Sequence, residues 1–167
     1  MERVIIIGCP GSGKSTFARK LRKVVSLPLY HLDMLYWNED KTTVSRDVFL
    51  DRLDAVMNNP LWIIDGNYIS SMEKRLSACD TVFFLDYPTR VCLDGIKERK
   101  GSMRSDMPWV ETGDDEAFIA FVKSFDAETK PIVEELLTKY SHKKIITFHN
   151  REESEIYLEK IQKERPE

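Results

Sequence analysis

The sequence predicts a three-layer α/β/α domain, in which a parallel β-sheet is covered by helices on both faces. Short runs rich in Val, Ile and Phe alternate along the chain with longer segments of helical periodicity. Since parallel strands are joined by right-handed crossovers that usually contain a helix, this alternation favours a parallel sheet. Runs such as Val4–Ile7 and Val82–Leu85 are continuously apolar, which is typical of strands buried on both sides.

The first part of the chain predicts a strand, a glycine-rich turn, a helix and a second strand. Arg3–Ile7 is expected to form the first strand, and Lys14–Val25 a helix, because its apolar side chains recur at helical spacing. Leu27–Leu32, entered through Pro28, is expected to form the second strand. The polar and aromatic segment Met34–Thr43 breaks the pattern and is expected to be a mobile loop over the site.

The middle of the chain predicts another helix and two more strands. Ser45 is placed to cap a helix over Asp47–Met57, where apolar residues form one stripe. Leu61–Ile64 is expected to be the third strand and Thr81–Leu85 the fourth. Pro88 then begins the next helix, because proline is well suited to the first helical position.

The last part of the chain predicts a second loop, the fifth strand and a closing helix. Gly101–Thr112 is expected to be a loop between two long helices, Lys144–Phe148 the fifth strand, and Glu152–Gln162 an amphipathic helix. Ligands bind beyond the carboxyl ends of the strands in such sheets. Several polar residues and one glycine fall at or just after predicted strand ends: Gly8, Asp33, Asp65 and Asp86.

Composition limits the classes of protein that the chain can belong to. Its 167 residues suit a single domain over residues 1–167, and no repeat or linker divides it. A net charge of −3 offers no general attraction to nucleic acid, although a local basic cluster keeps contact with DNA open. Three dispersed cysteines favour neither a disulfide framework nor a zinc site. With no expected signal peptide or membrane span, we expect a cytoplasmic protein of unknown oligomeric state.

Residues 8–15 match the phosphate-binding pattern G-x-x-x-x-G-K-[ST], between a strand and a helix as that chemistry requires. Glycines allow backbone N–H groups to point inward at phosphate oxygens, and the following helix adds partial positive charge. Lys14 is expected to contact the phosphates and the Ser15 hydroxyl to ligate Mg²⁺. The expected nucleotide-binding residues are Gly8, Pro10, Gly11, Ser12, Gly13, Lys14, Ser15 and Thr16.

Aspartates at strand ends are the candidate catalytic and metal-binding carboxylates. Asp65 ends an apolar run and is expected to hold Mg²⁺ together with Ser15, directly or through water. Asp86 ends the next strand and competes for this role, although it is also placed to cap a helix. Asp33 is expected to accept a proton from an attacking hydroxyl, to bind the acceptor or to help hold the metal. We interpret the neighbouring His31 as structural.

Arginines outside the phosphate loop are candidates to neutralise charge during phosphoryl transfer. Arg99 and Arg104 flank Gly101, so a lid of about residues 99–113 would bring them over the phosphates and exclude water. The alternative is a solvated basic helix end. Arg75 is expected either to bind an acceptor anion or to form a salt bridge in solvent.

Four aromatic residues are candidates to stack on a planar ring or to line the acceptor pocket: Tyr36, Trp37, Tyr68 and Trp109. Tyr68 is placed near the rim because it follows the Asp65-Gly66-Asn67 turn. The alternative is that these rings anchor the core or the loops, which is the commoner use of aromatic side chains.

The chain resembles the small P-loop kinases of the adenylate kinase-like superfamily, and most closely the bacterial DNA topology modulation (FlaR-like) group. The resemblance covers nearly the whole chain and rests on residues 5–16 (IIIGCPGSGKST), 29–33 (LYHLD), 62–68 (WIIDGNY), 81–86 (TVFFLD) and 104–109 (RSDMPW). It implies a five-stranded parallel sheet of order 2-3-1-4-5, ATP on the phosphate loop, and a short lid with arginines. It also implies that Asp65-Gly66 lies near the metal and the acceptor.

Departures from the adenylate kinase pattern concern the acceptor. In adenylate kinases an aromatic residue, a proline and an arginine follow the Asp-Gly pair, whereas Asn67-Tyr68-Ile69 follows here. The threonine-containing loop that reads adenine is replaced by His31-Leu32-Asp33. A nucleoside monophosphate acceptor is therefore not carried over.

Two functions follow as expectations. The first is an ATP-dependent phosphotransferase acting on a small molecule, such as a nucleoside, nucleotide or polar metabolite. Lys14, Asp33, Asp65, Arg99 and Arg104 would be its catalytic residues, with Asp33, Tyr68 and Arg75 binding substrate. The alternative is an ATP-binding regulator with little turnover that acts on DNA topology or a protein partner through the basic cluster at residues 90–104.

Overall fold

Within residues 1–113 and 115–164, which the computed structural model describes, five parallel strands form one sheet in the order β2-β3-β1-β4-β5. The strands are β1 (Arg3–Gly8), β2 (Leu29–His31), β3 (Trp62–Asp65), β4 (Thr81–Leu85) and β5 (Lys144–Phe148). The helices are α1 (Lys14–Val25), α2 (Leu32–Tyr36), α3 (Arg46–Met57), α4 (Ile69–Ala78), α5 (Thr89–Arg99), α6 (Glu116–Glu128), α7 (Lys130–Lys139) and α8 (Arg151–Lys163). The predicted fold class and strand order are confirmed.

The central strand β1 separates two hydrophobic clusters. Val4 and Ile6 face a cluster that includes residues of α1, α5, α6 and α8, whereas Ile5 and Ile7 face residues of α3, α4 and α7. All four side chains are fully buried, and each contributes about 1.5–3 kcal/mol of hydrophobic stabilisation. The continuously apolar runs are therefore strands covered on both faces, as predicted.

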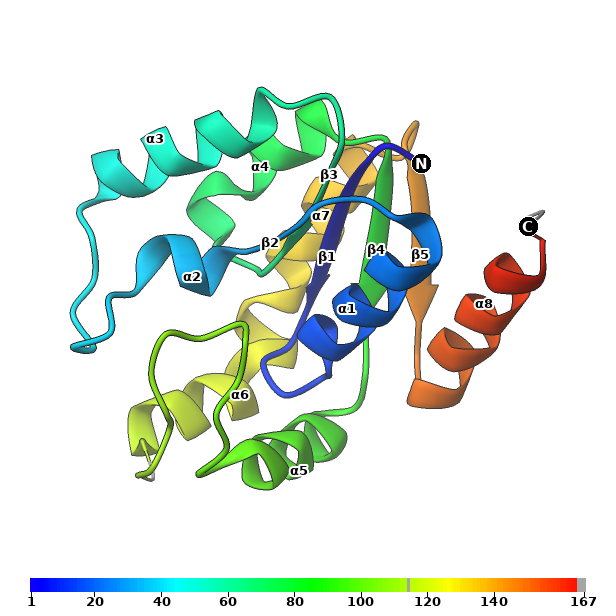
Figure 1. The fold of residues 1–167 in the computed structure, drawn as a ribbon. Helices are drawn as coiled ribbons and strands as arrows, with labels where there is room; N and C mark the ends of the chain where they lie inside the picture. Colours follow the sequence, from blue (N-terminus) through cyan, green and yellow to red (C-terminus); the bar gives the residue numbers. More distant parts are fainter. Residues whose placement is uncertain (114, 165–167) are drawn as a thin grey trace.

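The arrangement of helices leaves one end of the sheet for a binding site. Figure 1 shows α3 and α4 on one side of the sheet, α1 and α8 on the other, and α5 and α6 beyond the carboxyl ends of the strands. The phosphate loop joins β1 to α1 at this same end. In the described part of the chain, no helix combines the length and apolar character needed to cross a membrane.

The segment around residues 27–43 differs from its prediction. The second strand covers only Leu29–His31, and a short helix, α2, begins at Leu32 in place of the expected loop. Leu32 is fully buried and packs against Gly66, where a Cβ would lie 2.9 Å from the Leu32 Cβ. After α2 the chain forms an antiparallel bridge between Trp37 and Thr43, so this segment is locally ordered rather than irregular.

The remaining elements lie close to their predicted positions. The Ser45 hydroxyl caps α3 by accepting the Val48 N–H at 3.3 Å, as its sequence position indicated. β3 begins and ends one residue later than predicted, so Asp65 is the last residue of the strand. The segment between α5 and α6 contains no helix or strand among its described residues, in agreement with the predicted loop.

Candidate active site

The phosphate loop is shaped by glycines that adopt left-handed backbone angles. Gly11 has φ of 84°, and a Cβ at this position would lie 2.0 Å from the Cys92 carbonyl oxygen of α5. The loop therefore lies directly against α5, as only glycine allows. The Lys14 Nζ donates to the carbonyl oxygens of Gly8 at 2.9 Å and Cys9 at 3.0 Å, which holds its ammonium group over the loop. Burial lowers the pKa of Lys14, and the negative charge of Asp65 opposes this shift.

Asp65 joins the phosphate loop to the neighbouring strands. Its backbone pairs with Ile6 in β1, and its side chain is only 4% exposed. Its Oδ2 accepts the Ser15 hydroxyl at 2.6 Å and lies 2.8 Å from the His31 Nδ1. Its Oδ1 is buried and has no hydrogen-bond partner. Because a buried carboxylate oxygen is costly to leave unpaired, this atom fits a role as a ligand of Mg²⁺ or of bound water.

Asp86 occupies a different environment from Asp65. Its carboxylate lies 2.8 Å from the Lys130 Nζ of α7 and 3.6 Å from the His149 Nδ1 that follows β5. These ion pairs join the ends of β4 and β5 to α7. Asp86 borders neither cavity described below, so the structure brings Asp65 rather than Asp86 to Ser15.

Asp33 and Tyr68 form a half-buried pair beside the phosphate loop. Asp33 lies in the first turn of α2, and its Oδ1 accepts the Tyr68 hydroxyl at 2.7 Å. Burial raises the pKa of Asp33, while the Tyr68 hydrogen bond opposes that shift. Tyr68 adopts φ of 37° at the start of α4, and its ring lies 5.1 Å from that of Tyr36. Asp33 is thus a partly desolvated carboxylate with one fixed donor.

Arg75 is placed differently from its prediction. Its side chain is fully buried in α4 and borders neither cavity, so it is neither solvent-exposed nor placed to bind an acceptor anion. Its guanidinium donates to the carbonyl oxygens of Gly66, Asn67 and Tyr68, which fixes the turn after β3. Burial lowers its pKa to about 10, so Arg75 stays protonated at neutral pH.

Asn67 was not singled out from the sequence, yet it fixes the phosphate loop to the β3 turn. Its amide donates to the Gly8 carbonyl at 2.6 Å and accepts the Gly8 N–H at 3.0 Å. Gly8, whose carbonyl also accepts from Lys14, is therefore bound to the turn through both backbone groups, and unlike the rest of the predicted nucleotide-binding set it borders neither cavity. The Asp-Gly-Asn run at a strand end was the available signal, because Asn commonly pairs with backbone at turns.

Both predicted lid arginines, Arg99 at the end of α5 and Arg104 in the segment that follows, border the cavities at the phosphate loop. Arg99 donates to both Glu111 carboxylate oxygens, at 2.9 and 3.1 Å. Arg104 lies 3.7 Å from Glu111 and 3.8 Å from Asp106. Asp106 is only 5% exposed and also lies 3.5 Å from Arg19 of α1. Because Arg99 and Arg104 turn inward, the basic cluster at residues 90–104 is not a single outward stripe.

Asp106 and Glu111 are further residues that the sequence did not indicate. Burial tends to raise the pKa of Asp106, but the Arg104 charge and the Ser15 hydroxyl outweigh it and lower that pKa. Both carboxylates hold the lid arginines in place. The only signal for such pairing was that two acidic residues, Asp106 and Glu111, follow the basic residues of the same segment.

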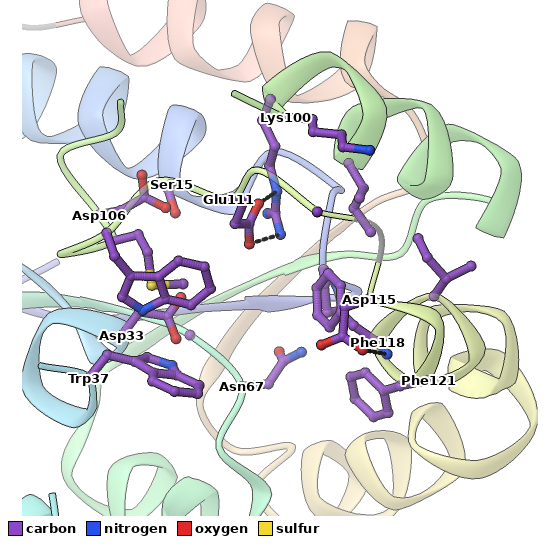
Figure 2. Close-up of a pocket in the computed structure, with 18 of the residues that line it drawn as sticks. Ser15, Asp33, Trp37, Asn67, Lys100, Asp106, Glu111, Asp115, Phe118 and Phe121 are labelled. Atoms are coloured by element: carbon purple, nitrogen blue, oxygen red, sulfur yellow. Dashed lines mark hydrogen bonds and ion pairs between the residues drawn. The ribbon is translucent and has the colours of Figure 1, made fainter. Parts of the chain in front are cut away.

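Two cavities meet at the phosphate loop. The smaller cavity, of about 450 Å³, follows the loop and the start of α1, and is bordered by residues of α5, of the segment between α5 and α6, and of α8. The larger cavity, of about 1020 Å³, extends from the loop past Asp33, Trp37 and Tyr68 and along α5 and α6 (Figure 2). Four residues border both cavities: Lys14, Ser15, Arg99 and Asp106.

The predicted site residues divide between these cavities. The smaller cavity contains most of the expected nucleotide-binding residues, namely Gly11, Ser12, Gly13, Lys14, Ser15 and Thr16, and also Arg104. Pro10 borders the larger cavity instead, together with Asp33, Asp65 and Tyr68. Among the described residues, no group of three or more His, Cys, Asp or Glu side chains could hold a metal by itself. A cation at Ser15 and Asp65 would therefore share its ligands with a bound phosphate or water.

Comparisons with known proteins identify the fold. No family model and no curated protein matches the chain, so the expected closeness to DNA topology modulation proteins is not shown. Solved structures that match include shikimate kinase from Acinetobacter baumannii in complex with shikimate (15% identity, TM-score 0.63, 100% of this chain and 96% of that chain). Shikimate kinase from Bacteroides thetaiotaomicron matches at 15% identity with a TM-score of 0.61, covering 97% of each chain. A gluconokinase from Sinorhizobium meliloti matches at 14% identity with a TM-score of 0.51, covering 84% of this chain and 92% of that one. The chain has a P-loop kinase-like α/β fold.

Proposed function

We propose that this protein is a kinase that transfers the terminal phosphoryl group of ATP to a hydroxyl group of a small molecule. The observation that carries the proposal is the pair of cavities that share Lys14, Ser15, Arg99 and Asp106. Phosphoryl transfer needs a donor and an acceptor on opposite sides of the transferred group, roughly in line. ATP in the smaller cavity and the acceptor in the larger one satisfy this requirement. The kinases among the structural neighbours support the same reaction class.

The residues at the meeting point of the cavities have complementary roles. The loop amides and Lys14 bind the phosphates, and Ser15 and Asp65 would hold Mg²⁺. When bound, Mg²⁺ neutralises charge on the phosphate oxygens. Arg99 and Arg104, oriented by Glu111, neutralise the charge that remains.

Asp33 is the proposed acceptor of the proton. The acceptor hydroxyl oxygen attacks the terminal phosphorus, its O–H proton passes to Asp33, and the bond to the β-phosphate oxygen breaks to release ADP. The desolvation that raises the pKa of Asp33 makes the carboxylate a better base, and the Tyr68 hydroxyl holds one oxygen in place. Arg75 takes part indirectly, by fixing the turn that presents Tyr68.

ADP release with Mg²⁺ and ATP, screened across nucleosides, nucleoside monophosphates and hydroxylated metabolites, tests the proposal. Lys14→Ala should lower acceptor-dependent ADP release by about a hundredfold or more. The substitution removes the ammonium group that stabilises negative charge on the transferred phosphoryl group. Lys23→Ala is the matched control, since Lys23 is an exposed lysine later in the same helix that borders neither cavity. Equal turnover in the two variants would contradict the proposal.

A further inference from the structure

We propose that the acceptor is an uncharged or positively charged alcohol carrying a flat ring, and not a carboxylate or a phosphate ester. This inference rests on the proposed function, because it names the substrate class of the larger cavity. Three features of that cavity carry it: aromatic walls next to Asp33, the carboxylates of Asp33 and Asp65 at the same place, and the position of all neighbouring cations except Lys41 at the phosphates or in the far part of the cavity.

Aromatic rings from two separate segments form the walls beside Asp33. Trp37, which follows α2, and Trp109, in the lid, lie 5.6 Å apart with their ring planes at 78°. Figure 2 shows Trp37 next to Asp33 at one end of the cavity. Tyr68, which bonds Asp33, lines the same end. Such rings bind flat apolar surfaces by stacking and edge contacts.

Unpartnered polar atoms mark this end of the cavity as built for a ligand. Asp65 Oδ1 and Trp109 Nε1 are both buried without a hydrogen-bond partner, and both residues line the cavity. A buried donor and a buried acceptor are costly to leave unpaired in a folded protein. Asp65 Oδ1 is assigned to Mg²⁺ or its bound water, so the Trp109 Nε1–H is the donor left for the acceptor, and a ligand hydroxyl oxygen can accept from it.

The charges beside these rings favour neutral or cationic ligands. Asp33, Asp65 and Asp106 all line this cavity near the phosphate loop, with Asp65 and Asp106 buried and Asp33 half-buried. Asp106 is paired with Arg104 and Arg19, whereas Asp33 and Asp65 form no ion pair with a lysine or arginine of the described residues. A carboxylate or phosphate on the acceptor would be repelled by them in a poorly solvated space. An ammonium group on the acceptor would be attracted by these carboxylates, and an uncharged alcohol would be neither repelled nor attracted.

Apart from Lys41, the cations that line this cavity in the described residues are assigned to the phosphates or lie in the far part of the cavity. Lys14 and Arg99 are both assigned to the phosphates of ATP in the proposed function, Lys14 from the phosphate loop and Arg99 oriented by Glu111. Lysines of α5 and α6 line the far part of the cavity, and Figure 2 shows Lys100 well away from Asp33 and Trp37. Lys41 stands 5.3 Å over the Trp109 ring, so it is the cation that an anionic acceptor could recruit.

The size of the cavity agrees with an acceptor of nucleoside size or larger. Its volume of about 1020 Å³ lies at the upper end of the range of about 300–1,000 Å³ usual for ligand sites. Beyond the aromatic walls it continues along apolar side chains of α5 and α6, namely Leu93, Ile96, Phe118, Ile119 and Phe121. A ring system with an apolar extension would fit this shape better than a compact sugar acid.

Binding of ligand series that differ only in charge tests the inference. Phenylethanolamine, phenylglycol and mandelate share a ring and a benzylic hydroxyl but are cationic, neutral and anionic, and nucleosides can be paired with their monophosphates. Quenching of tryptophan fluorescence and calorimetry should show each cationic or neutral member binding more tightly than its anionic partner, by about tenfold or more. Shikimate and gluconate, both carboxylates, should not stimulate ADP release.

Variants locate the source of the discrimination. Asp33→Asn should bring the anionic and neutral affinities of each series closer together, whereas Glu116→Gln, an acid at the far part of the same cavity, should leave their ratio unchanged. Tighter binding of the anionic members overturns the inference. The case against it is strongest if Lys41→Ala abolishes that tighter binding, because Lys41 is then the cation that recognises the anion. Failure of every ring alcohol to bind overturns it too. If calorimetry shows that the protein does not bind ATP, the proposed function is overturned instead. The fluorescence assay needs no ATP, so the two failures can be told apart.

Discussion

At the scale of single residues, Asp33 shows a conflict between stability and activity. A carboxyl group whose pKa is raised by folding binds its proton more tightly in the folded state than in the unfolded state. It therefore contributes stability at low pH that is lost as the pH rises through the folded pKa. At neutral pH the ionised Asp33 consequently destabilises the fold, and it is retained where a base is needed.

Asp33→Asn should raise the melting temperature at neutral pH and lower turnover by about a hundredfold or more. The Asn side chain keeps an oxygen that can accept the Tyr68 hydroxyl but carries no charge to desolvate. Thermal unfolding at several pH values should show the variant's advantage growing as the pH rises from acid to neutral. Asp51→Asn, at an exposed position of α3, should change stability by less than about 0.5 kcal/mol. A melting temperature that falls in Asp33→Asn at neutral pH would contradict this account of the charge.

At the scale of elements, the contact between the phosphate loop and α5 depends on the absence of side chains. Gly11 needs its positive φ and also lies against the Cys92 carbonyl oxygen. On the α5 side, a Cβ at Gly95 would lie 2.1 Å from the Gly11 carbonyl oxygen. The loop and α5 therefore hold each other through backbone contact, which sets the position of the amides that face the smaller cavity.

Gly11→Ala should destabilise the protein by about 1–3 kcal/mol and weaken ATP binding by about tenfold or more, because the loop must move away from α5. Gly113→Ala is the control, since a Cβ there would meet no atom within 4 Å and its φ is not in the left-handed region. Denaturant unfolding and calorimetry with ATP measure the two effects. Retention of full ATP affinity in Gly11→Ala would mean that this contact does not set the loop.

The lid gives a second prediction at this scale, concerning how Glu111 acts. Glu111 does not bind phosphate itself but orients Arg99, so it is a positioning residue. Arg99→Met should lower kcat by about a hundredfold, and Glu111→Gln by a smaller factor, since Gln can still accept one of the two hydrogen bonds. The double variant should be no slower than Arg99→Met alone, because Glu111 has nothing left to orient. Factors that multiply in the double variant would show an independent role for Glu111.

At the scale of the whole molecule, the sequence predicts the scaffold better than it predicts individual side-chain partners. The strands buried on both faces and the phosphate loop carry strong local signals, so Lys14, Ser15 and Asp65 are predictable as one group. Arg75 is the opposite case, because an arginine on a helix is usually exposed. Only the path of the turn after β3 shows that three carbonyl oxygens face its guanidinium.

The missed residues share a physical cause. Asn67, Asp106 and Glu111 act through partners that are distant in the sequence, namely Gly8, Arg19 and Arg99. Spacing along the chain carries no information on such contacts unless the element between them is regular. The α2 helix was missed for a related reason, since the burial of Leu32 against Gly66 overrides the weak local preference of a short segment.

The division of the molecule into two cavities gives a prediction about linkage between ligand binding and unfolding. A ligand that binds only the folded state at a free concentration of about 100 times its Kd stabilises that state by about 2.7 kcal/mol. A non-hydrolysable ATP analogue with Mg²⁺ should produce this increment in the native protein and in Asp33→Asn, because Asp33 borders only the larger cavity. Lys14→Ala should lose most of this increment in stability. Removal of Mg²⁺ with a chelator should reduce the increment in the native protein, since Ser15 and Asp65 then have no cation to share with the phosphates. Denaturant unfolding with and without the analogue measures each value. An increment that falls equally in Asp33→Asn and Lys14→Ala would mean that the nucleotide occupies both cavities, leaving no separate place for an acceptor.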